Sequence, residues 1–228
     1  MEIRDALRQT ASIRSFTDET IPDTEVHAIL DDARFAPSGG NRQPWKVAVV
    51  KDGELRRGLA HAMKPVWNEY IALSQSGRTP FAVVNGPEPL TAPPADIPFP
   101  LLDAIEKVPV VLAVAADLSL IATMDSDLGR PTISGGGSIY PFCWSILLSA
   151  RDRGLGGVMT TFATRAEATT GPLLALPDGH ALVATIFLGR PERVITKLRR
   201  KAVGEFTTIN RFDGPALTSG TSVPRRVD

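Results

Sequence analysis

The chain has 228 residues, and its 25 Lys and Arg balance 25 Asp and Glu, so its formal net charge at pH 7 is zero. This balance argues against a general binder of nucleic acid or anionic membranes, because both need a positive field. The single cysteine, Cys143, excludes an intrachain disulfide framework. No secretory signal or spanning helix of ~20 apolar residues is evident, so we expect a cytoplasmic protein without a membrane partner.

Two helices and a strand are predicted in the first 50 residues. Ile3 and Leu7 indicate a short helix that stops near Ser12. A second helix is predicted by apolar residues that recur every three to four positions on one face. These residues are Val26, Ile29, Leu30 and Ala33. Pro37 ends that helix, and the β-branched run over residues 45–50 predicts a strand.

The middle of the chain combines a capped helix with a long loop. Asp52 is placed to cap a helix that carries Leu55 and Leu59. Residues 77–100 contain seven prolines and no periodic pattern. A loop of this length inside a compact domain is usually functional or disordered. Residues 108–116 then predict a buried strand.

The second half alternates helices and strands. Residues 138–153 are apolar almost all round, which predicts a helix that is buried on most sides or lies at a subunit interface. Residues 157–161 predict a short strand, and residues 181–188 predict a longer one. Between them, residues 164–167 match a capping box at the start of a helix. The sequence therefore predicts helices and strands mixed in one core.

Several kinds of site find no support in the sequence. The three histidines share no ligand spacing, so we predict no metal site. Residues 136–140 lack the closing glycine of a nucleophile elbow, and no Walker or Gly-x-Gly-x-x-Gly loop opens a helix. Cys143 is interpreted as a small core residue rather than a catalytic thiol.

Two basic segments remain as candidate anion sites. Ser12-Ile13-Arg14 offers a hydroxyl and a guanidinium, which can clamp one phosphate through charge-assisted hydrogen bonds. Residues 197–201 contain four cations, which indicates a solvated surface patch or a small nucleic-acid footprint. The zero net charge makes the nucleic-acid interpretation less attractive, and we expect no nucleic-acid partner.

Three motifs and a basic pair occur in a characteristic order. Residues 12–16 are Ser-Ile-Arg-Ser-Phe, residues 36–45 are Ala-Pro-Ser-Gly-Gly-Asn-Arg-Gln-Pro-Trp, and residues 154–161 are Gly-Leu-Gly-Gly-Val-Met-Thr-Thr. Arg200-Lys201 follows the last predicted strand. In this order the segments resemble the FMN-dependent nitroreductase family, which also includes flavin reductases and iodotyrosine deiodinase. The resemblance covers residues 4 to about 203.

The resemblance implies an α+β fold of the nitroreductase type. A central, mostly antiparallel sheet would be flanked by helices, and two chains would form an intertwined homodimer with one FMN at each of two interface sites. We expect a single FMN-binding domain over residues 1–212, followed by a loose tail over residues 213–228. Residues 64–100 are expected to form a substrate lid over the flavin.

The resemblance also implies which residues bind FMN. Ser12 and Arg14 would hold its phosphate and ribityl chain together with Arg200. The loop at 37–41 would reach the flavin from the partner subunit, and the strand end at 159–161 would lie near flavin N5. The complete implied set is Ser12, Ile13, Arg14, Pro37, Ser38, Gly39, Asn41, Met159, Thr160, Thr161 and Arg200. Thr10 stands where the family usually has an arginine, and Arg199 or Lys201 could compensate.

The function that follows from the resemblance is an FMN oxidoreductase working by ping-pong. It would take hydride from NADH or NADPH and reduce an electron-poor small molecule, a nitroaromatic or a quinone. No catalytic side chain is assigned, because the cofactor carries the chemistry. One alternative is a reductive dehalogenase, for which Lys64, Glu69 and Tyr70 lie in the region of the deiodinase substrate clamp at a different spacing. Another is a flavin-binding protein without turnover.

Overall fold

The computed structural model describes residues 1–218, and the chain divides into two compact units. The first unit is Met1–Thr196, and the second begins at Lys197. Within the second unit, a short 3₁₀ turn spans Val203–Glu205 and an isolated bridge pairs Thr208 with Ala216. The predicted single domain over 1–212 spans this division and stays a prediction. Most of the predicted tail, 219–228, lies outside the described residues.

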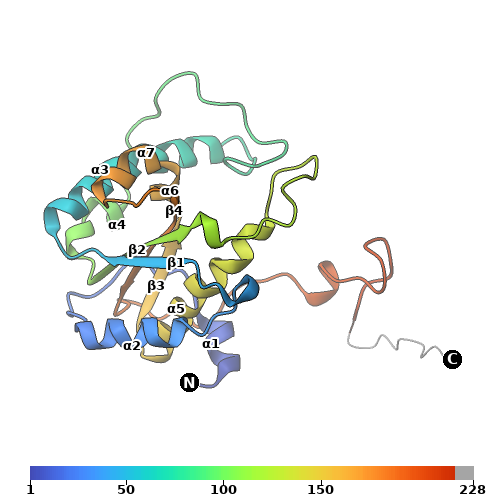
Figure 1. The fold of residues 1–228 in the computed structure, drawn as a ribbon, viewed down its shortest axis with the longest axis horizontal. Coiled ribbons are helices and arrows are strands. Elements are labelled where there is room, and N and C mark those ends of the chain that lie inside the picture. Colours follow the sequence, from blue (N-terminus) through green and yellow to red (C-terminus); the bar gives the residue numbers. More distant parts are fainter. Residues whose placement is uncertain (219–228) are drawn as a thin grey trace. The chain divides into compact units, whose positions relative to one another are not determined.

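A four-stranded sheet forms the centre of the first unit (Figure 1). Its strands are β1 (Trp45–Val49), β2 (Val110–Asp117), β3 (Gly156–Thr160) and β4 (His180–Gly189). The spatial order is β1-β2-β4-β3, and every neighbouring pair is antiparallel. The prediction of a central antiparallel sheet is therefore confirmed, and β1 and β3 form its two edges.

Helices cover both faces of this sheet, with α1, α2 and α5 on one side and α3, α4, α6 and α7 on the other (Figure 1). The first set comprises α1 (Ile3–Gln9), α2 (Asp23–Ala33) and α5 (Tyr140–Asp152). The second comprises α3 (Gly53–Ser74), α4 (Pro100–Asp103), α6 (Phe162–Arg165) and α7 (Glu167–Leu173). The first unit is an α+β fold in three layers.

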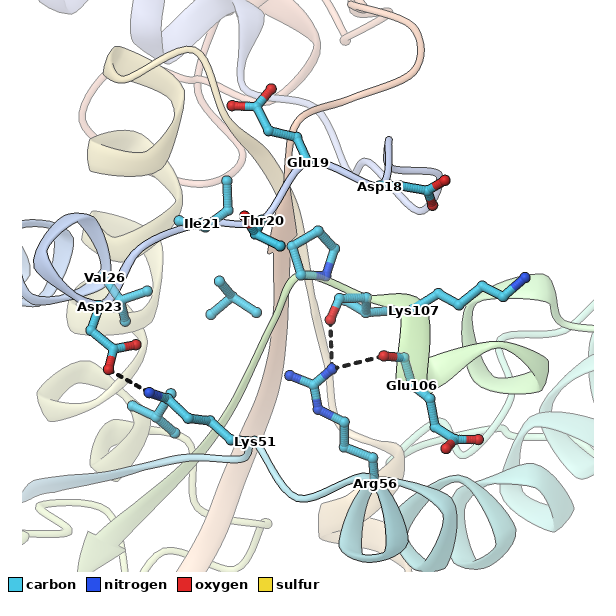
Figure 2. Close-up of a pocket in the computed structure, with 14 residues that line it drawn as sticks. Asp18, Glu19, Thr20, Ile21, Asp23, Val26, Lys51, Arg56, Glu106 and Lys107 are labelled. Carbon is cyan, nitrogen blue, oxygen red and sulfur yellow. Dashed lines mark hydrogen bonds and ion pairs between the residues drawn. The ribbon is translucent and has the colours of Figure 1, made fainter.

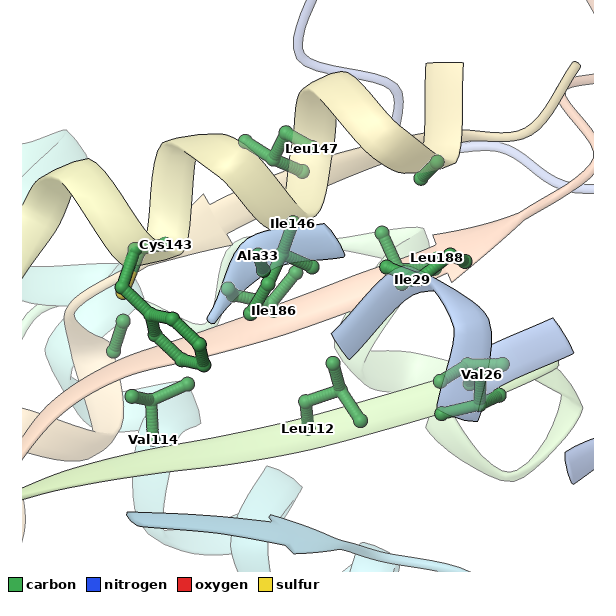
Figure 3. Close-up of a cluster of buried hydrophobic side chains, with 14 of the residues drawn as sticks. Val26, Ile29, Ala33, Leu112, Val114, Cys143, Ile146, Leu147, Ile186 and Leu188 are labelled. Atoms are coloured by element: carbon green, nitrogen blue, oxygen red, sulfur yellow. The ribbon is translucent and has the colours of Figure 1, made fainter. Parts of the chain in front are cut away.

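Two hydrophobic clusters join the layers, because alternate residues of a strand point to opposite faces. On β2, Leu112 and Val114 pack with α2 and α5, as Figure 3 shows. Their neighbours Val111 and Ala113 pack with the helices on the other face. Cys143 is fully buried in the first cluster, and this burial raises the pKa of its thiol to about 12. The interpretation of Cys143 as a core residue is confirmed.

One local prediction around the helices is confirmed and another is wrong. The Asp52 carboxylate caps α3 as expected by accepting from the Leu55 N–H at 2.7 Å, but the helix continues to Ser74, so the predicted lid begins inside it. The capping box at 164–167 is wrong. The chain enters α6 directly after β3, so Thr164 lies inside that helix, and α7 begins at Glu167 without a side-chain cap. No helix within residues 1–218 is long and apolar enough to cross a membrane.

Candidate functional site

The Ser12–Arg14 segment lies beside the first residues of β3. Ser12 forms an isolated parallel bridge with Gly157, and the Ile13 N–H donates to the Gly157 carbonyl at 2.9 Å. The approach depends on glycine, since a Cβ at Gly156 would lie 2.7 Å from a side-chain carbon of Ile13. Ile13 is buried, whereas Ser12 and Arg14 are exposed. The structure thus places two of the predicted flavin segments side by side at β3.

The end of β3 carries a buried hydroxyl that lacks a partner. Thr160 pairs with Thr185 on β4, and its Oγ1 makes no hydrogen bond to any described residue. An unsatisfied buried polar group of this kind costs about 1–3 kcal/mol. A group that hydrogen-bonds Thr160 here would remove that cost. Thr161 is exposed at the strand end, and Met159 is half-buried against the first hydrophobic cluster.

The loop at 37–41 is held in an uncommon backbone conformation. Gly40, Asn41 and Gln43 have φ values of 61°, 53° and 49°, in the left-handed region that side chains other than glycine rarely adopt. The Ser38 hydroxyl fixes the loop by accepting from the Gln43 N–H at 2.9 Å. The Gly39 N–H donates to the Ser138 hydroxyl at 3.1 Å, next to the start of α5. Such strained, well-braced loops are frequent at functional sites.

This loop does not join the other two segments within the described chain. It leads into β1, at the sheet edge opposite to β3. Three strand spacings separate these edges, about 14 Å. No described hydrogen bond links Pro37–Asn41 to Ser12–Arg14 or to Met159–Thr161. Within one described chain, the loop therefore lies at the opposite edge of the sheet from the other two segments.

Arg200 belongs to the second unit. Its guanidinium is exposed, and Nη1 donates to the Arg199 carbonyl at 2.8 Å. Its predicted part in binding a phosphate stays a prediction. Arg199 and Lys201 are exposed in the same unit.

Thr10 is buried, and its hydroxyl donates to the Ala6 carbonyl at 2.7 Å, so it caps α1 instead of offering a donor to a ligand.

Arg151 was missed by the sequence reasoning. It lines a narrow cleft together with Thr10, Ile13 and Gly157. Its Nη2 donates to the Gln9 side chain at 3.0 Å, while its buried Nε has no partner in the described chain. The sequence feature that could have pointed to Arg151 is a basic residue in the last turn of a mostly apolar helix.

The predicted lid packs onto the helix that follows β3. Trp67 stacks on Phe99 with ring centroids 4.2 Å apart. Both rings contact Phe162, the residue directly after Thr161, at 6.0 and 6.2 Å. Tyr70 also contacts Phe162, at 6.1 Å. The aromatic side chains of the lid therefore gather beside the strand end that the resemblance places near flavin N5.

Neither the deiodinase-like clamp nor a metal site is formed in the described chain. Lys64 Nζ pairs with Asp103 at 2.5 Å and with Asp96 at 3.6 Å, so it is engaged away from Glu69 and Tyr70. Among residues 1–218, no group of His, Cys, Asp and Glu side chains could hold a metal ion.

Comparison with known proteins identifies the family to which this chain belongs. The model of the Nitroreductase family matches residues 7–190, so the chain belongs to the nitroreductase family. The chain is 27% identical to the nitrobenzene nitroreductase of Ectopseudomonas oleovorans over 224 residues, which covers 90% of this chain and 96% of that protein.

Solved structures show the same fold. The NADPH:FMN oxidoreductase of Vibrio harveyi, complexed with NAD⁺, has a TM-score of 0.64 and 21% identity, covering 92% of this chain and 77% of that one. A nitroreductase-like family protein from Bacillus cereus has a TM-score of 0.65 and 18% identity, covering 92% and 96%. The prediction of a nitroreductase-like fold is therefore confirmed.

Proposed function

We propose that this chain is an FMN-dependent oxidoreductase that takes hydride from NADH or NADPH and reduces an electron-poor small molecule, a nitroaromatic or a quinone, by ping-pong. The family membership supports the class of reaction, and the similarity to a nitrobenzene nitroreductase supports the acceptor. The observation that carries the proposal is the unpartnered Thr160 hydroxyl on the strand that Ile13 joins through Gly157.

The residues present suit a flavin phosphate and ring. Ser12 and Arg14 are exposed beside β3 and would hold the phosphate and ribityl chain, and Arg151 is a further cation that lines a cleft with Ile13. Thr160 would hydrogen-bond the cofactor at the strand end. The aromatic side chains around Phe162 would exclude water from the acceptor side. Bound FMN would supply the exchange of hydride and electrons, and the chain would orient it and tune its electrostatics.

We also propose a homodimer whose sites each take the 37–41 loop from a second copy. The opposite positions of β1 and β3 in the sheet support this arrangement. On α5, Tyr140 and Trp144 lie four residues apart on one face and are 42% and 37% exposed. Large exposed apolar side chains on an otherwise buried helix suit a subunit interface.

A steady-state acceptor panel tests the proposed activity. We expect FMN-loaded protein to oxidise NADH or NADPH rapidly with nitrobenzene or benzoquinone and only slowly without an acceptor. Bound FMN without turnover on any acceptor would instead support a flavin-binding protein that does no catalysis. Nitroaromatic reduction at the rate of free FMN would contradict the proposal.

A further inference from the structure

A cavity of about 350 Å³ opens between the end of β1, the start of β2 and the segment that leads into α2 (Figure 2). None of the residues assigned to the proposed flavin site lines it. Much of its wall is apolar and comes from Ile21, Val26, Val49, Pro109 and Val110. Its volume lies at the lower end of the ~300–1,000 Å³ usual for small-molecule sites.

One buried cation faces this cavity. Arg56, at the start of α3, is only 7% exposed. Its Nε donates to the Val50 carbonyl at 2.8 Å, and its Nη1 donates to the carbonyls of Val108 at 2.7 Å and Glu106 at 3.2 Å. Figure 2 shows the guanidinium directed into the cavity. A guanidinium has five N–H donors, and the two on Nη2 have no partner among the described residues.

Three of the four carboxylates on the wall form ion pairs with cations other than Arg56. Asp23 pairs with Lys51, Glu19 pairs with Arg190, and Glu106 pairs with Arg57 through its side chain. The Asp18 and Glu19 carboxylates point away from the middle of the cavity in Figure 2.

Within residues 1–218, no carboxylate forms an ion pair with Arg56, so carbonyl oxygens are its only described acceptors. Burial lowers the pKa of Arg56, and the Glu106 charge only partly opposes this. A buried cation without a counterion is costly, which favours an anion as the occupant.

We propose that this cavity binds a small carboxylate with a compact aliphatic body. The carboxylate would accept hydrogen bonds from Arg56 Nη2, and the body would pack against Val26, Val49 and Val110. A phosphate suits the cavity less well, because a single nitrogen offers two donors to a group with more oxygens, and the facing wall is apolar. The cavity shares Asp18, Lys107 and Val108 with the hollow beside Arg14, but it contains none of the residues assigned to FMN, and the proposal does not depend on the proposed activity.

Pivalate is a suitable probe, because its tert-butyl group gives one sharp proton signal for saturation-transfer NMR. Titrating the full chain with pivalate gives the dissociation constant, and pivalamide serves as the neutral control of the same shape. We expect pivalamide to bind at least about 10-fold more weakly, since a hydrogen bond to a charged group contributes about 1.5–3 kcal/mol.

Variants at Val49 locate the binding. Val49 lines the cavity and is 40% exposed, so a larger side chain at this position need not disturb the core. We expect Val49→Phe to fill the cavity and weaken pivalate binding at least 10-fold, while Val49→Ala retains affinity within about 3-fold. Arg56→Lys should also weaken binding at least 10-fold. If Arg56→Lys does not fold, the comparison of Val49→Phe with Val49→Ala still tests the proposal.

Three outcomes of the pivalate and pivalamide titrations would overturn this inference. They are the absence of any saturation transfer to pivalate, equal affinity for pivalamide, and unchanged pivalate binding in Val49→Phe. Inorganic phosphate is titrated as a competitor. Displacement of pivalate by phosphate at concentrations below the pivalate dissociation constant would replace a carboxylate by a phosphate as the ligand and so contradict the assignment.

Discussion

The backbone N–H of Ile13 donates to the carbonyl of Gly157 at 2.9 Å, and this bond holds the N-terminal segment against the edge strand of the sheet. This hydrogen bond leaves little room for side chains on the β3 side of the contact. Gly157 has no room for a Cβ, which would lie 2.5 Å from a Leu188 carbon and 2.6 Å from the Phe187 carbonyl oxygen. The proposed flavin site therefore rests on close backbone packing at this glycine.

The first prediction concerns that packing. Gly157→Ala should lower the free energy of unfolding by about 1–3 kcal/mol, because the new methyl group overlaps backbone as well as side-chain atoms. It should also weaken FMN binding by moving Ile13 and its neighbours away from β3. Thermal melts and FMN titration measure the two effects. Gly129→Ala is the control, since a Cβ there meets nothing within 4 Å and should change neither value.

The second prediction concerns the Thr160 hydroxyl. Thr160→Val should raise the melting temperature of the FMN-free protein, since it replaces an unpartnered buried hydroxyl by a methyl group. The same change should weaken FMN binding about 2- to 10-fold, the value of one ordinary hydrogen bond. The control is Thr170→Val. Thr170 is also buried, but its hydroxyl donates to the Ala163 carbonyl at 2.8 Å, so this variant should lose stability and keep its FMN affinity. Unchanged FMN affinity in Thr160→Val would count against the proposed contact.

Sequence reasoning located the elements that carry strong local signals. The spacing of Val26, Ile29 and Ala33 identified α2, and those side chains are buried. Asp52 was placed correctly as a cap because capping involves only neighbouring residues. The Thr164 capping box failed for a nonlocal reason, since the end of β3 determines where α6 begins.

Only part of the candidate site could be predicted from the sequence. Motif order indicated the segments, but the position of Thr160 depends on its pairing with Thr185 on β4, a strand that lies 20 or more residues away in the chain. The inward-facing Arg56 depends on carbonyls from two other segments, at Val50 and Val108. Arg151 gave no recognisable pattern, because its place beside Thr10 arises from the packing of α5 against α1. Tertiary contacts of this kind leave no periodic mark in the sequence.

A third prediction tests the cationic side of the site. Arg14→Ala should raise the FMN dissociation constant about 10- to 100-fold, the loss expected for a hydrogen bond to a charged phosphate. The variant should also show a weaker dependence of FMN affinity on salt, because one exposed cation is removed. Arg34→Ala removes an exposed cation that pairs with Asp31, and it should leave FMN affinity unchanged. Equal effects of the two changes would argue for a general charge effect instead of a phosphate contact.

A fourth prediction concerns pH and the loop before α5. Ser134 and Arg130 side chains and the Ile133 N–H donate to Asp125, and these contacts hold the pKa of its carboxyl well below the ordinary value. A lowered folded-state pKa contributes stability above the unfolded pKa of about 3.9, and this contribution is lost as pH falls below it.

Asp125→Asn should therefore melt below the wild type at neutral pH, with a gap that narrows below about pH 4. Asp127→Asn is the matched control and should follow the wild type throughout. Thermal melts of the wild type and both variants between pH 7 and pH 3 give the comparison. A gap that stays constant from pH 7 to pH 3 would show that the Asp125 charge does not stabilise the loop.

A fifth prediction tests the two-chain site. One variant, Arg14→Ala, weakens FMN binding on the strand side, and another, Gly40→Val, disrupts the left-handed loop at φ 61°; both are assayed at an FMN concentration too low to load either variant alone. Mixing the two after subunit exchange should restore activity, because each mixed dimer would contain one intact strand side facing one intact loop. Activity in the mixture that never exceeds the average of the separate variants would mean that each chain forms its site alone.

The proposed function depends above all on whether the chain binds FMN as a redox cofactor. The most direct measurement is the visible spectrum of the purified protein, loaded with FMN and freed of excess flavin, under anaerobic conditions. We predict one flavin per chain, loss of its absorbance on adding NADH or NADPH, and its return on adding nitrobenzene. Failure to retain FMN, or a bound flavin that neither nucleotide reduces, would contradict the proposed function.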